Sequence, residues 1–441
     1  MDEGIIVGLT GRFGAGCTST GTFFEKNFNF KTYSVSSFLK TKAKKEISGF
    51  ELKTSKEIRE ILQDLGDSMR KIGPSALVQP IIQEIKKNNV KNAVIECLRN
   101  PAEIKALKEA FGGRFFLISV DAETEIRWKR VEELYKGDRA KFDTDEKRDA
   151  GGEDQPEFGQ QVKECMEQAD ILINSEEDFF NSDGTKNEKA IDRYGQKLSD
   201  YTVLMQSFGV RPPYPDELYM HQACSIALWS KCSRRQVGAV IVREILNDKS
   251  AKDDSKEIKK QNGIILQSYV ISMGCNNVPW GEKDCAILYK ADTQEAKCYR
   301  EKIRNNFFKK FKYCRICGLP LENTLTCKCG YNNKNIPGKM LDLCRAVHAE
   351  EAAIIQSAKL GSSPLEGTKL YTSLFPCMLC AKKIINSGIK SVVYLESYPM
   401  GETLAIDMFR KCNIFIKKYE GVTSNSFNKL FRREIKKKYI K

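Results

Sequence analysis

Residue types that bind zinc lie close to a glutamate in the second half of the chain. His348 and Glu350 are separated by one residue, and Pro376 precedes Cys377 and, three positions later, Cys380. One imidazole and two thiolates leave one position of a tetrahedral zinc ion for water, whose pKa the metal lowers to roughly 7. A carboxylate two residues after the histidine is placed to move protons without binding the metal. The spacing therefore predicts an open, catalytic zinc site.

A closed structural zinc site is the alternative interpretation. Such a site takes a fourth protein ligand, and the chain has only two histidines, one of which is His348. The order His-x-Glu followed by Pro-Cys-x-x-Cys is typical of zinc enzymes that deaminate nucleobases. We therefore expect His348, Cys377 and Cys380 to bind the metal and Glu350 to transfer protons while water attacks C4 of cytosine.

Four further cysteines form a second motif upstream. Cys314 and Cys317 are followed by Cys327 and Cys329, in the order Cys-x-x-Cys and Cys-x-Cys. Four thiolates in two knuckles match a structural zinc ribbon, which would stabilise a segment that otherwise lacks an apolar core. Buried or free thiols are the alternative.

A glycine-rich turn near the N-terminus resembles a phosphate-binding loop. Gly11, Gly14 and Gly16 precede Cys17 and Thr18, and the turn follows an apolar strand and opens a helix. Backbone amides at such a turn can cradle phosphate, and the threonine can reach Mg²⁺. The pattern normally has lysine where Cys17 stands, so fast phosphoryl transfer is not expected.

The elements around these motifs indicate two α/β domains. Apolar runs at 5–9, 93–95 and 115–120 alternate with helical patterns, which predicts a parallel sheet. A polar stretch with Pro212, Pro213 and Pro215 follows. We therefore place a domain boundary near residue 205, and a polar insertion at about 281–340.

Composition narrows the class of protein. Of 441 residues, 41% are hydrophobic and 29% charged, no apolar run reaches membrane-spanning length, and the N-terminus does not look like a signal peptide. We expect a cytoplasmic protein with no membrane partner. In a reducing compartment, the 16 cysteines favour metal sites over disulfides. The net charge of +14 fits polyanionic partners or phosphorylated substrates, or is a solvated basic tail such as 429–441.

The second half resembles the deoxycytidylate deaminases. The resemblance lies in segments 233–242, 274–279, 370–385 and 387–394. It implies that Asn276 contacts the sugar hydroxyl and that Ala349 and Tyr394 also contact substrate. The chain departs from the family pattern at Cys275, which replaces an aromatic residue, and at Ala352, which replaces an asparagine.

The first half resembles P-loop nucleotide kinases, such as dephospho-coenzyme A kinases and deoxynucleotide kinases. Segments 94–101, 118–122 and 169–174 carry the resemblance, and Glu96 lies where such kinases often have aspartate. The resemblance implies that Glu96 joins the glycine-rich turn in binding a nucleotide, with Mg²⁺ as a further cofactor. A nucleotide-binding regulator, an active kinase and a vestigial scaffold remain open.

The whole arrangement resembles the bacterial antiviral deoxycytidine nucleotide deaminases. The expected fold is α/β: a P-loop NTPase-like parallel sheet in residues 1–205, and a cytidine-deaminase-like α/β/α domain in residues 206–441 that contains the zinc-ribbon insertion. The resemblance implies a hydrolase that converts dCTP, dCMP or both to deoxyuridine nucleotides and depletes dCTP during phage infection. Its implied partners are a nucleotide effector (a dNTP, ATP or GTP), an inhibitory RNA or protein regulator, and further copies of the chain. A housekeeping dCMP deaminase that supplies dUMP, a nucleic-acid editing deaminase acting on cytosine or adenosine, and a nucleotide-binding switch without turnover are the alternatives.

Overall fold

The structure is a computed structural model with two compact units. It describes residues 4–151, 156–177, 179, 185–246, 265–288, 298–300, 313, 319, 329, 344–361, 364–397 and 402–432. Unit 1 comprises Met1–Pro213 and Glu420–Lys441, and unit 2 comprises Tyr214–Tyr419. We predicted a second domain that reaches residue 441, whereas the structure returns the chain to unit 1 from Glu420 onward. Among the described helices, none combines the length and apolarity needed to cross a membrane.

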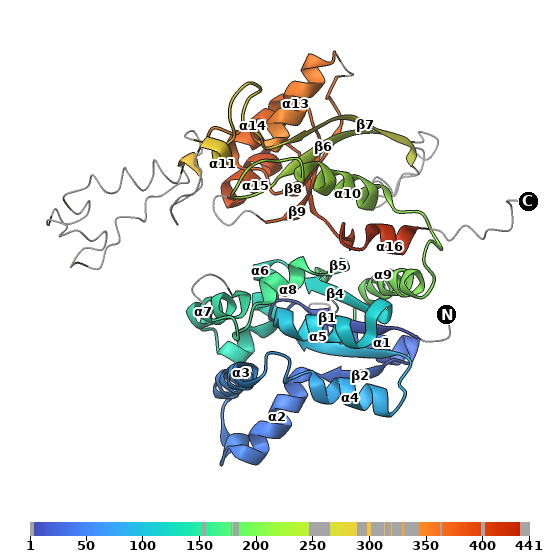
Figure 1. Ribbon diagram of the computed structural model, residues 1–441, viewed down its shortest axis with the longest axis vertical. Helices are drawn as coiled ribbons and strands as arrows, with labels where there is room; N and C mark the ends of the chain where they lie inside the picture. Colours follow the sequence, from blue (N-terminus) through green and yellow to red (C-terminus); the bar gives the residue numbers. More distant parts are fainter. Residues whose placement is uncertain are drawn as a thin grey trace, which may run out of the picture. The chain divides into compact units, whose positions relative to one another are not determined.

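Unit 1 is built on a mostly parallel sheet (Figure 1). Its strands, in spatial order, are β11 (Gly421–Val422), β5 (Ile171–Asn174), β4 (Phe115–Asp121), β1 (Ile6–Thr10), β3 (Ala93–Leu98) and β2 (Lys31–Ser34). Every pairing is parallel except that of β11 with β5. The strands β1 and β4 are buried along their whole length, as expected for a sheet covered on both faces.

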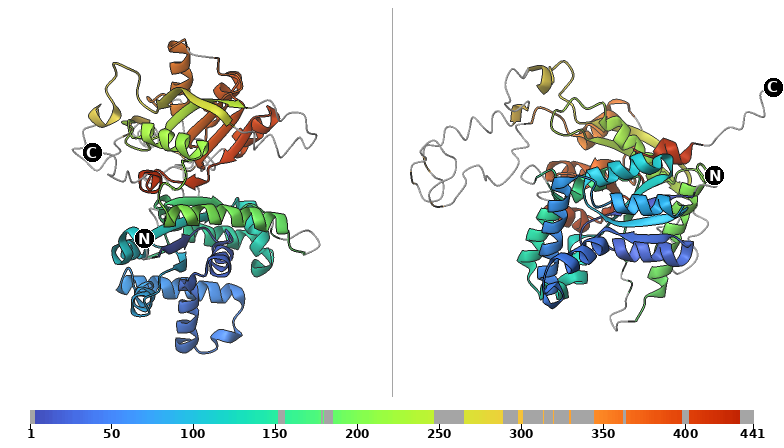
Figure 2. Two further views of the ribbon diagram at one scale, coloured as in Figure 1. Left: turned by 90° about the vertical axis from the view of Figure 1, so that its right-hand side faces the viewer. Right: turned by 60° about the horizontal axis from the view of Figure 1, so that its bottom comes forward.

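Helices cover both faces of this sheet. One face packs against α1 (Cys17–Phe28), α9 (Glu188–Gln206) and α16 (Phe427–Phe431), and the green helix α9 lies along this face in Figure 2. The other face packs against α2 (Val35–Glu46), α4 (Gln79–Lys87), α5 (Pro101–Phe111) and α8 (Val162–Glu167). The remaining helices of unit 1 are α3 (Ser55–Ile72), α6 (Thr124–Val131) and α7 (Arg139–Ala150), with short 3₁₀ turns η1 (Phe50–Leu52), η2 (Gly112–Arg114) and η3 (Glu132–Tyr135).

Capping residues fix where the unit 1 helices begin. Thr54 and Glu57 form a reciprocal capping box at the start of α3, and Asn100 and Glu103 form another at α5. Pro101 occupies the first position of α5, where its missing N–H costs no hydrogen bond. These boundaries hold α3 and the end of β3 in fixed positions.

Residues 420–432, which follow unit 2 along the chain, complete unit 1. Gly421 pairs with Leu172 and Val422 with Ile171, which adds the antiparallel sixth strand. Leu430 of α16 is fully buried in the core of the α9 face. The backbone N–H of Thr423 donates to the carbonyl of Asp170 at 2.9 Å. This strand is too short for hydrophobic periodicity to predict.

Unit 2 contains the mixed sheet β10-β9-β8-β6-β7. The strands are β6 (Gly238–Leu246), β7 (Ile265–Cys275), β8 (Lys369–Leu374), β9 (Ser391–Glu396) and β10 (Phe415–Lys418). The hairpin partners β6 and β7 are antiparallel, β8 is antiparallel to β6, and β8, β9 and β10 are parallel. The helices are α10 (Pro215–Ala227), α11 (Cys285–Leu288), α13 (Ala349–Lys359), α14 (Met378–Asn386) and α15 (Glu402–Lys411).

The helices of unit 2 lie on both faces of the sheet. The core of one face joins α13, α14 and α15 to inward residues of β6, β8 and β9. On β8, Tyr371 alternates to the opposite face, where its ring lies 5.4 Å from that of Tyr219 of α10. The structure is therefore mixed α/β, as predicted.

Candidate active site

Three metal-binding side chains converge in unit 2. Nδ1 of His348 lies 3.4 Å from Sγ of Cys377 and 3.3 Å from Sγ of Cys380. The three ligand atoms all lie within 4.8 Å of one another. A tetrahedral zinc ion at roughly 2.0–2.3 Å from each ligand requires separations of this size. The donor set therefore fits zinc.

Two helix N-termini position these ligands. His348 immediately precedes α13 and Cys377 immediately precedes α14, both with extended backbone angles. Cys380 lies in the first turn of α14, so both thiols meet on one side of the helix start. The N-terminus of a helix favours negative charge, which suits thiolate ligands.

The neighbouring thiols influence each other's pKa. A hydrogen bond with Cys380 lowers the pKa of Cys377 to about 4, and the same contact raises the pKa of Cys380. The hydrogen bond to Cys377 also raises the pKa of His348. Metal binding requires deprotonated thiols. A zinc ion bound here would therefore displace the protons that the two cysteines still hold.

Glu350 is buried beside this cluster, with 4% of its surface exposed. Burial raises the pKa of Glu350 to about 7, so this carboxyl can both accept and donate a proton near neutral pH. Its position in the first turn of α13, two residues after His348, directs it to the same end of the helix as the ligands.

Gly274 permits the close packing of α13 against β7. A Cβ at Gly274 would lie 2.5 Å from the backbone nitrogen of Ala353 and 2.8 Å from Cβ of Ala352. The helix that carries Glu350 therefore rests directly on the strand backbone. Ala352 is small enough for this contact.

The structure describes all three residues that are predicted to contact substrate. Asn276 accepts a hydrogen bond from the N–H of Val237 at 2.8 Å and donates to the carbonyl of Arg235 at 2.8 Å. Its amide thus holds the loop before β6. Ala349 is fully buried in α13, and Tyr394 of β9 packs edge-on against Phe375, with ring centroids 4.8 Å apart. The substrate contacts of Asn276, Ala349 and Tyr394 therefore stay predictions.

The predicted zinc ribbon cannot be placed. Cys314, Cys317 and Cys327, and most of the 281–340 insertion, lie outside the described residues. Cys329 is described and exposed. Four-cysteine binding therefore stays a prediction.

The glycine-rich turn of unit 1 joins β1 to α1. Gly14 and Gly16 have φ of 80° and 103°, conformations that other residues rarely adopt. A Cβ at Gly11 would lie 2.2 Å from the carbonyl oxygen of Val120. Cys17 begins α1, and Thr18 follows as an exposed residue of its first turn.

Glu96 of β3 lies against α1. A Cβ at Gly21 would come within 1.9 Å of Oε1 of Glu96, so the carboxyl packs onto the helix backbone. Burial raises the pKa of Glu96 to about 7, while a hydrogen bond with Thr18 acts in the opposite direction. Glu96 is thus close to Thr18 but does not line the adjacent cavity.

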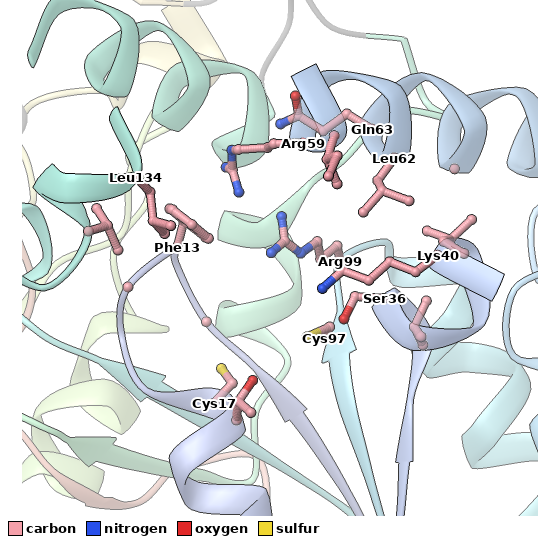
Figure 3. Close-up of a pocket in the computed structure, with 18 of the residues that line it drawn as sticks. Phe13, Cys17, Ser36, Lys40, Arg59, Leu62, Gln63, Cys97, Arg99 and Leu134 are labelled. Atoms are coloured by element: carbon pink, nitrogen blue, oxygen red, sulfur yellow. The ribbon is translucent and has the colours of Figure 1, made fainter. Parts of the chain in front are cut away.

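This cavity has a volume of about 1080 Å³ (Figure 3). Its lining includes Gly11, Gly14, Gly16, Cys17 and Thr18 of the turn. Lys40 of α2, Arg59 of α3 and Arg99 after β3 also line it, and sequence reasoning did not single these out. Arg99 could have been found, because it follows a predicted parallel strand at the carboxyl edge where ligands bind. The inward direction of Lys40 and Arg59 depends on tertiary packing.

Comparisons with known proteins agree with the geometry of unit 2. The profile of the cytidine and deoxycytidylate deaminase zinc-binding region matches residues 213–396. Deoxycytidylate deaminase of Enterobacteria phage T4 is 40% identical over 84 residues, which are 19% of this chain and 42% of that protein. Deoxycytidylate deaminase of Schizosaccharomyces pombe is 26% identical over 211 residues, 47% of this chain and 45% of that protein.

Among solved structures, the apo dCMP deaminase from the cyanophage S-TIM5 is 19% identical, with a TM-score of 0.26, over 47% of this chain and 100% of that chain. The matches to the two curated relatives each span less than half of the relative's length. The predicted resemblance of the second half is therefore supported: residues 213–396 match the profile of the cytidine and deoxycytidylate deaminase zinc-binding region.

Proposed function

We propose that the protein is a zinc-dependent hydrolase that deaminates deoxycytidine nucleotides, dCMP, dCTP or both, to deoxyuridine nucleotides. The observation that carries this proposal is the convergence of His348, Cys377 and Cys380 within 4.8 Å. The buried Glu350 in the same helix turn and the family match over residues 213–396 support it.

The roles of the four residues follow from their chemistry. His348, Cys377 and Cys380 would hold zinc, which supplies Lewis-acid activation of water when bound. Glu350 accepts a proton from water and passes protons to the ring nitrogen and to the departing ammonia. Water adds at C4, the C4–N bond breaks, and the cytosine ring becomes uracil without any change of redox state.

Further residues complete the proposed substrate site. Asn276 would contact the sugar hydroxyl, and Ala349 and Tyr394 would line the ring pocket. Asn276 retains unused acceptor capacity, because its carbonyl oxygen can take a second hydrogen bond beside that from Val237. We also propose a domain division at about residue 205. A structural zinc ion would be bound by Cys314, Cys317, Cys327 and Cys329.

Unit 1 is proposed to be a P-loop nucleotide-kinase-like domain that regulates unit 2. The conformations of Gly14 and Gly16, the cavity beside them and the parallel sheet support nucleotide binding. The effector would be a dNTP, ATP or GTP. Deamination would deplete dCTP during phage infection, under restraint by an RNA or protein regulator. We further propose a cytoplasmic homo-oligomer.

Deamination assays test the activity directly. Purified protein is offered dCMP, dCTP, cytidine and single-stranded DNA, and ammonia release is measured alongside the uracil product. We expect turnover of one or both free nucleotides, and none with Glu350→Ala. Deamination of DNA alone would replace this proposal with nucleic-acid editing.

Pool measurements test the biological role. Expressing cells are challenged with phage, and dCTP and dUMP are quantified over the infection. A fall in dCTP supports defence. Steady dUMP supply with an unchanged dCTP pool would favour housekeeping deamination, which the matches to deoxycytidylate deaminases also support.

A further inference from the structure

The phosphate-binding turn of unit 1 has no cation of its own at the position where its sequence pattern expects one. Cys17 stands there, and burial raises the pKa of its thiol, so the side chain is neutral at physiological pH. Neutral backbone amides alone hold a phosphate less tightly than amides joined by a charged donor. Arg12 of the turn also lines the cavity, but its guanidinium already faces Glu146 at 3.9 Å, so we look to other elements for the cation that holds a ligand phosphate.

Two cations from other elements point into the same part of the cavity. Lys40 comes from α2 and Arg99 follows β3, and Figure 3 shows the charged end of Lys40 between Ser36 and the guanidinium of Arg99, with Cys97 below. Lys40 has no carboxylate partner among the residues that the structure describes. Its ammonium group is therefore available to an anionic ligand.

Local backbone geometry places Arg99 at this point. The pairing of β1 with β3 shifts register between Gly8 and Thr10, and Cys97 adopts a φ of 65°. Left-handed backbone at a residue that is not glycine costs free energy, and such costs concentrate at functional sites. The N–H of Arg99 donates to Glu103 at 2.9 Å, which anchors the turn. Because of this irregularity, Glu96 packs against α1 whereas Arg99, three residues later, lines the cavity.

The other arginine in Figure 3 has a different role. Arg59 stacks on the ring of Phe13 at 3.8 Å and pairs with Asp149 of α7 at 2.5 Å. Arg99 shares Asp149 at 3.1 Å, but it also bonds the neutral Gln160 at 3.0 Å. Arg59 is thus held as part of the wall, while Lys40 and the remaining donors of Arg99 face the cavity.

The cavity offers a poor site for a divalent cation. Among the described residues that line it, Glu51 is the single carboxylate, and Lys44 pairs with it at 2.5 Å. Glu96 lies behind Thr18 against Gly21 and is outside the lining. Magnesium needs carboxylate or phosphate oxygens in near-octahedral geometry. The lining also contains Arg12, Lys44, Arg70 and Arg130. The first three pair with carboxylates and Arg130 donates to the carbonyl of Ser175, so charge compensation falls first to Lys40 and the remaining donors of Arg99.

Apolar side chains also line the cavity. Phe13, Phe50, Leu62 and Leu134 line it, and Figure 3 labels three of them. A volume of about 1080 Å³ exceeds what inorganic phosphate fills and accommodates a phosphorylated ligand with a ring system.

We propose that this cavity binds a nucleoside phosphate in a magnesium-independent manner, with Lys40 and Arg99 holding the phosphates in place of the missing loop lysine. This inference rests on the proposed nucleotide-binding role of unit 1. Beyond that role, it names Lys40 and Arg99 as the residues that supply positive charge to the phosphates, and it states that nucleotide binding requires no divalent metal. Phosphoryl transfer is not part of the proposal.

Equilibrium dialysis of the full-length chain tests it. The probes are ATP, GTP, dTTP and dCTP, each with and without added Mg²⁺, and inorganic tripolyphosphate as the probe without a base. The variant Glu350→Ala is used throughout so that dCTP is not consumed. In this background we compare Lys40→Gln, Lys40→Arg and the control Lys45→Gln, because Lys45 is an exposed residue of α2 that does not line the cavity.

We expect at least one nucleotide to bind without Mg²⁺. Lys40→Gln should weaken that binding roughly tenfold or more, because a hydrogen bond to a charged group contributes about 1.5–3 kcal/mol. Lys40→Arg should retain most of the affinity, Lys45→Gln all of it, and tripolyphosphate should bind more weakly than the nucleotide. Binding only with Mg²⁺, equal binding by Lys40→Gln, or tripolyphosphate binding as tightly as the nucleotide would overturn the proposal.

Deamination measured on the chain with Glu350 intact separates this inference from the proposed function. Active deamination of dCMP or dCTP without nucleotide binding at unit 1 would reject the cavity proposal alone. Nucleotide binding that depends on Lys40, in a chain that deaminates nothing, would support the cavity proposal and reject the deaminase.

Discussion

Each unit places a cysteine at the start of a helix and a buried glutamate nearby. In unit 1 these are Cys17 and Glu96, and in unit 2 they are Cys377 and Glu350. Burial raises the pKa of both glutamates to about 7. The cysteines differ: the pKa of Cys17 is raised by burial, whereas hydrogen bonding to Cys380 lowers that of Cys377 to about 4.

This difference between Cys17 and Cys377 indicates that a position at a helix N-terminus is not sufficient to make a cysteine a thiolate. The helix dipole contributes about 0.3–1 kcal/mol near a surface, less than the cost of burying an unpaired thiolate. Nδ1 of His348 lies 3.4 Å from Cys377 and 3.3 Å from Cys380 in one cluster, and Cys17 has no comparable pair among the described residues. The partners turn a common local motif into a metal site.

Removing a ligand from that cluster should have the largest effect. We expect His348→Ala and Cys377→Ser to lose both bound zinc and measurable deamination, because two remaining ligands do not hold a catalytic ion. Zinc per chain is measured by mass spectrometry, with Cys17→Ser as the matched control. A Cys377→Ser protein with one tightly bound zinc and full activity would contradict the assignment.

Glu350→Ala separates proton transfer from metal binding. We expect kcat to fall by roughly 10²–10⁴-fold, the usual contribution of a general acid–base, while zinc content is unchanged. The matched control is Glu351→Gln, since Glu351 is in the same helix turn but pairs with Lys383. Equal losses in the two variants would indicate damage to α13 instead of a proton-transfer role.

Cysteine labelling tests the contrast between the two helix starts. With a neutral alkylating reagent at pH 7.5, we expect the exposed Cys412 to react at least roughly tenfold faster than Cys17, whose raised pKa leaves little thiolate. Cys377 should react only after a chelator has removed zinc. Peptide mass spectrometry reads all three sites, and fast labelling of Cys17 would show that its thiol is not held neutral.

Replacing Glu96 should have a smaller, pH-dependent effect on stability. The pKa of Glu96 rises from its ordinary value of 4.5 to about 7 in the folded chain, so its ionisation opposes folding. This penalty is absent below about pH 4.5, grows as the pH rises to 7, and is then constant. Glu96→Gln should therefore gain stability relative to the parent between pH 5 and 8, by on the order of 1 kcal/mol. Urea unfolding measures it, and a gain independent of pH would contradict the burial argument.

The metal site was the most predictable part of the molecule. His348, Glu350, Cys377 and Cys380 stand in two short segments whose residue types and spacing already specify the chemistry. Local sequence also places both segments at helix starts, so little tertiary information was needed. The alternating strands and helices of unit 1 were predictable for the same reason, because periodicity reports on burial.

The cavity of unit 1 was only partly predictable. Its glycines were recognisable, but Lys40 enters the cavity because α2 packs near the end of β3, and no local pattern specifies that contact. The left-handed Cys97 likewise has no preceding sequence cue, since a cysteine there reads as an ordinary strand residue. The return of the chain to unit 1, where β11 joins the sheet, could not be predicted either, because β11 pairs with β5 through only two residues.

That return reverses the usual order of folding during synthesis. Residues 420–432 leave the ribosome only after all of unit 2 has been made, although they complete the sheet that residue 6 begins. Until then the outer edge of β5 has no neighbour, and exposed strand edges invite pairing with other chains. Unit 1, translated first, therefore cannot reach its final form until unit 2 has been synthesised, and its open strand edge is a site for aggregation in the meantime.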